Sequence, residues 1–161
     1  MSGRVKQACI HSLSDDYDPN QSTLEDYGSD VKETKISVMS SPNEDMLSVV
    51  DEAYPELGMP EKLLQKFWKR RSDYRMNSAI DDPHNRAYTE LNLDEEYREY
   101  IRGSQEAQRA LSELVNRVRS GEQVTLVCVE ESHEMCHRHV LREMLLTRIQ
   151  NNLTAVKRVI Q

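Results

Sequence analysis

The feature that most constrains the fold is an almost unbroken apolar run, Val-Thr-Leu-Val-Cys-Val, at residues 124–129. A strand with one face in water alternates apolar and polar residues, whereas a strand covered on both faces is apolar throughout. Such runs are typical of parallel sheets between layers of helices. We therefore predict a three-layer α/β fold with a small, mainly parallel sheet and helices on both faces.

The rest of the chain supplies the other elements of such a fold. Short β-compatible segments at 5–13 and 34–39 predict two further strands. Apolar residues at helical spacing follow Asn43, Pro60 and Ser104, and Ser132 is placed to cap a last helix. In the helix after Pro60, the repeat predicts that both Phe67 and Trp68 are buried, with Trp68 as a core anchor.

Two segments are predicted to lie outside helices and strands. Residues 14–34 are acidic and contain few large apolar side chains, which predicts a flexible insertion. Residues 81–85 contain paired aspartates before a proline and are read as a loop.

Length, charge and cysteine content restrict the class of protein. A chain of 161 residues suits a single domain, here 1–161, and its formal charge of −7 argues against a protein that coats nucleic acid. No apolar run approaches the ~20 residues needed to cross a bilayer, so we expect no membrane partner and a cytoplasmic location. Three cysteines without a secretory context predict reduced thiols.

The candidate site follows the apolar strand. Cys128 and Glu130 end that strand, and the run Cys136-His137-Arg138 begins the next helix, so these residues should gather at the carboxyl edge of the sheet. We predict Cys136 and His137 as catalytic residues and Arg138, Cys128 and Glu130 as ligand-binding residues. Helix neighbours point about 100° apart, so we do not expect the Cys136 and His137 side chains to pair directly.

This segment resembles a known family. Val-Cys-Val-Glu, five residues and then Cys-His-Arg resemble the signature of the family called domain of unknown function 488 (DUF488), and Glu56-Leu57-Gly58 resembles its Glu-Leu-Gly turn. The resemblance covers roughly residues 35–146. It implies a basic run at the end of the second strand, where this chain has Ser37-Val38-Met39-Ser40. A second anion-binding arginine is therefore missing at that position.

Three functions remain open on the sequence alone. The first is a binding or catalytic site for an anionic small molecule or a nucleic-acid end, because a helix N-terminus and an arginine both favour anions. The second is a non-enzymatic interaction or regulatory protein in which the Cys-His-Arg cluster is structural. The third is a structural metal site that uses Cys128, Cys136 and His137 with His133, or Cys9 with His11. The Cys-x2-Cys pairs of common zinc sites are missing, so we expect neither a metal nor a cofactor.

Overall fold

The chain folds around a four-stranded sheet in which every strand is parallel to its neighbours. The computed structural model describes residues 4–13, 33–131 and 133–160. In chain order its elements are β1 (Val5–Cys9), the 3-10 turn η1 (Ile10–Leu13), β2 (Glu33–Ser37), α1 (Glu44–Ser48), β3 (Glu52–Ala53), the 3-10 turn η4 (Pro55–Leu57), α2 (Glu61–Arg75), α3 (Pro83–Glu90), α4 (Leu93–Gly103), α5 (Gln105–Arg119), β4 (Gln123–Cys128) and α6 (His137–Ile160).

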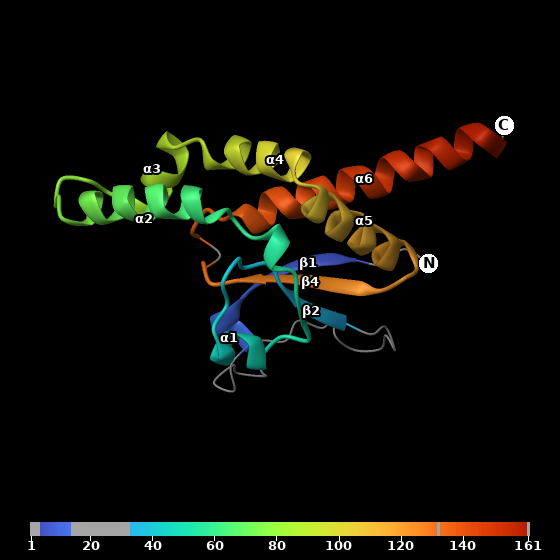
Figure 1. Cartoon of the computed structure of the whole chain (residues 1–161), viewed down its shortest axis with the longest axis horizontal. Coiled ribbons are helices and arrows are strands. Elements are labelled where there is room, and N and C mark those ends of the chain that lie inside the picture. The colour runs from blue at the N-terminus through green and yellow to red at the C-terminus, as the bar shows by residue number, and fades with distance from the viewer. Residues whose placement is uncertain (1–3, 14–32, 132, 161) are drawn as a thin grey trace.

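The last strand in the sequence lies inside the sheet. The strand order is β1-β4-β2-β3, so β4 is flanked by β1 and β2, and Val124 to Cys128 are all buried. In Figure 1, α2 to α6 lie on one side of the sheet, and η1 and α1 lie on the other. The apolar run at 124–129 therefore correctly predicted a strand covered on both faces, and the three-layer α/β fold is confirmed.

The segment after Asn43 departs from the predicted helix. The Asn43 side chain caps α1 by accepting a hydrogen bond from Met46 N at 2.8 Å, but the helix ends at Ser48. Asp51 then exchanges two hydrogen bonds of 2.8 Å with the Lys35 backbone, and the chain continues as β3 along the edge of β2.

The helices after α2 largely agree with the sequence. Ser104 caps α5 by accepting a hydrogen bond from Ala107 N at 3.2 Å, and Gly121 stops the following turn in the left-handed region, with φ of 102°. Residues 81–85 are not a simple loop, because α3 already begins at Pro83 and is capped by the Asp82 side chain. An aspartate followed by proline is a recognised helix start.

Trp68 is not a core anchor. Its side chain is 50% exposed, whereas the neighbouring Phe67 is buried with 3% exposure. The two residues follow each other on α2 and so point about 100° apart. The apolar stripe of α2 is therefore narrower than the sequence suggested, and it leaves the indole at the rim of a cleft.

The predicted acidic insertion at 14–34 lies mostly outside the described residues, which leave out residues 14–32. Among the residues that are described, none of the helices has a stretch long and apolar enough to span a membrane.

Candidate functional site

A cleft opens at the carboxyl end of the strands. Its volume is about 880 Å³, and it is bounded by the segment after β2, by one face of α2, and by the segment that follows β4. Cys128, Glu130 and His137 all line it, so the strand end predicted from sequence does meet the start of α6 here. A smaller cavity of about 430 Å³ between α5 and α6 is lined by Ser112, Asn116 and Arg148 among others and has no thiol or histidine in its wall.

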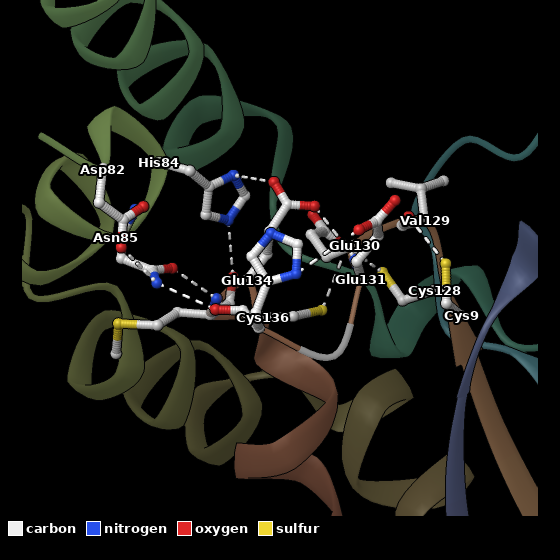
Figure 2. Close-up of polar contacts among 12 residues, drawn as sticks. Cys9, Asp82, His84, Asn85, Cys128, Val129, Glu130, Glu131, Glu134 and Cys136 are labelled. Carbon is white, nitrogen blue, oxygen red and sulfur yellow. Dashed lines mark hydrogen bonds and ion pairs between the residues drawn. The ribbon is translucent and has the colours of Figure 1, made fainter.

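Glu130 contacts both cysteines of the predicted site. Its Oε2 atom accepts hydrogen bonds from Cys128 Sγ at 2.8 Å and from Cys136 Sγ at 3.2 Å (Figure 2). Cys128 and Cys136 are each only 2% exposed. One carboxylate oxygen therefore joins the end of β4 to the residue that precedes α6.

Burial and these contacts set the ionisation of the cluster. Burial would raise the pKa of Glu130, but the hydrogen bond from Cys128, the charge of His137 and the hydrogen bond from Cys136 together bring it below its ordinary value. The interaction with Cys136 and burial raise the pKa of the Cys128 thiol well above its ordinary value. The site therefore combines an ionised carboxylate with a protonated Cys128.

His137 is buried and held by the backbone of the segment after β2. Its Nε2 atom lies 2.6 Å from the Val38 carbonyl oxygen, and a carbonyl only accepts, so Nε2 donates. The neutral ring then carries its lone pair on Nδ1, which lies 3.6 Å from Cys136 Sγ. Cys136 and His137 thus do meet, against expectation, because Cys136 stands before the first residue of α6 and not within the helix.

Arg138 points away from the cleft into the protein. Its side chain donates hydrogen bonds to the carbonyl oxygens of Ala8, Glu130 (2.9 Å) and Glu131 (3.4 Å), and the residue is 5% exposed. The guanidinium is therefore occupied by backbone carbonyls and is not exposed at the surface of the cleft. In this structure the guanidinium ties the end of β1 to the segment that leads into α6.

The first turn of α3 holds the segment that leads into α6 through hydrogen bonds that the sequence did not predict. Asn85 Oδ1 accepts from Met135 N at 2.7 Å, and Asn85 Nδ2 donates to His133 O at 3.0 Å (Figure 2). His84 Nε2 donates to Met135 O at 2.9 Å. The Asp82-Pro83 helix start was the available signal, because it places two polar side chains in the first turn of a helix.

His84 also contributes to the cleft wall. Its Nδ1 atom lies 3.1 Å from Glu134 Oε2, although the contact lacks the angles of a hydrogen bond. Both residues line the cleft. A second histidine and a second carboxylate therefore lie beside Cys128, Cys136 and His137, which we call the Cys-His cluster.

The basic side of the cleft comes from α2. Five residues of this helix line it, at spacings of three or four, namely Glu61, Leu64, Trp68, Arg71 and Arg75. Residues at this spacing share one face of a helix. The adjacent Arg70 does not line the cleft and instead pairs with Glu90 at 3.4 Å.

His133, which was considered as a metal ligand, does not join the cluster. The His133 side chain is 72% exposed and lies 3.5 Å from Glu131 Oε2. The side chain of His11 lies outside the described residues. Its proposed partner Cys9 donates a hydrogen bond from Sγ to Val129 O at 3.3 Å.

Comparison with known families gives a match over most of the chain. The family model DUF488-N3a, described as the active DUF488-N3 subclade, matches residues 22–149. The chain belongs to the DUF488-N3a family. The resemblance inferred from the Cys-His-Arg signature is thereby confirmed, and the match extends beyond the segment that was first compared. No curated protein and no solved structure matches this DUF488-N3a chain.

The second motif of the resemblance has a structural explanation in this DUF488-N3a protein. Tyr97 donates a hydrogen bond to Leu57 O at 2.5 Å, and Tyr100 donates one to Glu56 O at 2.8 Å. The ring centroids of Tyr97 and His137 are 5.1 Å apart. The Glu-Leu-Gly turn thus anchors the tyrosine that packs against the histidine of the site.

Proposed function

We propose that the protein binds a nucleotide in the cleft, with the base on Trp68, the phosphate on Arg71 and Arg75, and the reacting part over the Cys-His cluster. The nucleotide is either free or the end of a nucleic-acid strand, because both offer an aromatic ring beside a phosphate. The observation that carries this proposal is the face of α2, whose exposed indole and two arginines line the same cleft as Cys128, Glu130 and His137.

The arginines have the charge that a phosphate needs. Within the described part of the chain, neither Arg71 nor Arg75 forms a hydrogen bond or an ion pair, whereas the adjacent Arg70 pairs with Glu90 at 3.4 Å. Burial and the neighbouring charge of Arg75 lower the pKa of Arg71. A bound anion would relieve this repulsion through charge-assisted hydrogen bonds.

The indole suits the base of the same ligand. Trp68 lies one helical turn before Arg71 and is half exposed, although large aromatic side chains are usually buried. Stacking of a base on an aromatic ring contributes about 1 to 3 kcal/mol and works for any base. The combination therefore favours a nucleotide over a simple inorganic anion.

Catalysis is proposed at the floor of the cleft. Cys136 and His137 are in contact, Nδ1 is the free base of the ring in the neutral tautomer, and Glu130 is ionised beside them. The description of the family as an active subclade supports a catalytic role over a purely regulatory one. Arg138 is assigned a positioning role, because its guanidinium is taken up by backbone carbonyls.

We expect Arg71→Ala to weaken nucleotide binding about 10- to 150-fold, which corresponds to the loss of a charge-assisted pair of about 1.5 to 3 kcal/mol. Isothermal titration calorimetry with the common ribo- and deoxyribonucleoside 5′-monophosphates measures the effect. Trp68→Ala should weaken the same titrations, because stacking of about 1 to 3 kcal/mol is lost, and should leave any binding of inorganic phosphate unchanged.

The matched control is Arg70→Ala, which removes an arginine from the same helix but one that faces Glu90. It should leave nucleotide affinity unchanged. A 5′-phosphorylated trinucleotide that binds more tightly than every mononucleotide would identify a nucleic-acid end as the ligand. Absence of binding by all these probes, or equal losses in the Arg70 and Arg71 variants, would overturn the proposal.

A further inference from the structure

We propose that the chain binds one zinc ion at the floor of the cleft, through Cys128 Sγ, Cys136 Sγ and His137 Nδ1, with Glu130 as the fourth ligand. The sequence ranked a metal site last, because no Cys-x2-Cys pair is present. The argument rests on the donor atoms that the fold brings together, and it is independent of nucleotide binding.

The three donors already converge. One ligand atom each from Cys128, Cys136 and His137 lies within 4.8 Å of the other two, and all three residues are buried. Tetrahedral zinc, with bonds of about 2.3 Å to sulfur and about 2.0 Å to nitrogen, places neighbouring donors roughly 3.5 to 4 Å apart. Small side-chain movements therefore suffice to close the site.

The histidine is oriented as zinc-binding histidines usually are. A ligating histidine typically donates its other ring N–H to a carboxylate or a backbone carbonyl, which fixes the tautomer and the ring. His137 Nε2 donates in this way to Val38 O at 2.6 Å. The Nδ1 lone pair is left facing Cys136 Sγ at 3.6 Å, on the side of the cluster.

Glu130 lies beside both sulfur donors. Its Oε2 atom accepts from both thiols, so the two S–H protons point into the space between the sulfurs and the carboxylate. A dication there would replace these two protons, which leave to solvent as the thiolates form. Two thiolates and a carboxylate would then hold the ion together with a neutral imidazole.

The donor set selects the type of metal. Thiolate and imidazole ligands suit zinc, whereas magnesium and calcium take oxygen ligands. Among the other sulfur and nitrogen donors considered from sequence whose side chains the structure describes, Cys9 Sγ donates to Val129 O and His133 is exposed. The cleft supplies an entry path, because Cys128, Glu130 and His137 line it.

Zinc would change the roles of Cys136 and His137 in the proposed function, because an Nδ1 atom bound to the ion has no lone pair left for base catalysis. A metal-bound thiolate is a ligand, and the ion itself would supply Lewis-acid chemistry at the cleft floor. Arg71, which feels the charge of Glu130, lies on the facing wall. A phosphate held there would be close to the ion.

The test is metal content of the full chain. Protein reconstituted with zinc under a phosphine reductant and passed through gel filtration should hold one zinc per chain by mass spectrometry of the metal. Cys128→Ser and Cys136→Ser should each lose this zinc, and Cys9→Ser should keep it. Cobalt added to the metal-free wild-type chain should produce a thiolate-to-cobalt charge-transfer band in the near ultraviolet.

The cobalt spectrum keeps the proposal testable if the cysteine variants do not fold, because it uses the wild-type chain alone. Absence of both stoichiometric zinc and the charge-transfer band would overturn the proposal. Zinc that persists in the Cys128→Ser, Cys136→Ser double variant would also overturn it, since the ion would then lie elsewhere. Loss of zinc without any change in nucleotide affinity would leave the nucleotide proposal intact.

Discussion

Replacing Arg138 with alanine is expected to lower the free energy of unfolding by about 3 kcal/mol, because the hydrogen bonds of a buried charged group to backbone carbonyls are lost. The guanidinium is buried and serves Ala8 O and Glu130 O, which belong to β1 and to the segment after β4. In a chain of this length the loss corresponds to a decrease of roughly 6 to 12 °C in Tm. Thermal and urea unfolding of the metal-free variant and wild type measure the effect.

The matched control is Arg102→Ala. The Arg102 side chain also contacts an acceptor, Glu95 Oε1 at 3.4 Å, but it is 62% exposed. Exposed ion pairs contribute about 0 to 1 kcal/mol, so this variant should unfold almost as wild type does. If Arg138→Ala keeps wild-type stability and instead abolishes nucleotide binding, Arg138 is the anion clamp that the sequence first suggested.

Gly58→Ala is expected to destabilise the protein by about 3 kcal/mol, since added atoms in a filled space force the surrounding backbone to move. A Cβ atom at this position would lie 2.5 Å from Ser40 Cα and 2.7 Å from Ser40 Cβ. The expected loss of stability comes from this steric clash and not from backbone strain, because Gly58 has an ordinary φ of −73°. Chemical denaturation provides the measurement.

The same substitution should also weaken nucleotide binding. Ser40 lines the cleft and follows Val38, whose carbonyl holds His137, so a displaced Ser40 segment disturbs the site. Gly103→Ala is the control, because a Cβ there meets nothing within 4 Å. Near the end of a helix, alanine should leave stability unchanged or raise it by up to about 1 kcal/mol. Wild-type stability in Gly58→Ala would show that the Ser40 segment moves aside without cost.

The sequence by itself determined the layers of the fold and the place of the site. The apolar run at 124–129 required cover on both faces, which only a sheet between helices provides. Strand ends of a parallel sheet meet at one edge, so Cys128 and Glu130 could be placed beside the start of α6. These inferences depend on local composition, which can be read from the sequence, and on the parallel direction of the strands, which that composition indicates.

Only the tertiary structure decided what each side chain of the site does. Arg138 and Arg71 are the same type of residue, yet Arg138 is buried and donates to backbone carbonyls, whereas Arg71 lines the open cleft. Cys136 and His137 are in contact because α6 begins at His137. Cys136 lies outside the helix, so the rotation of about 100° between helix neighbours does not separate the two side chains. The narrow stripe of α2 left Trp68 at the rim of the cleft. Each outcome depends on which residues lie opposite in space, because charge, burial and hydrogen-bond partners come from segments far apart in the chain.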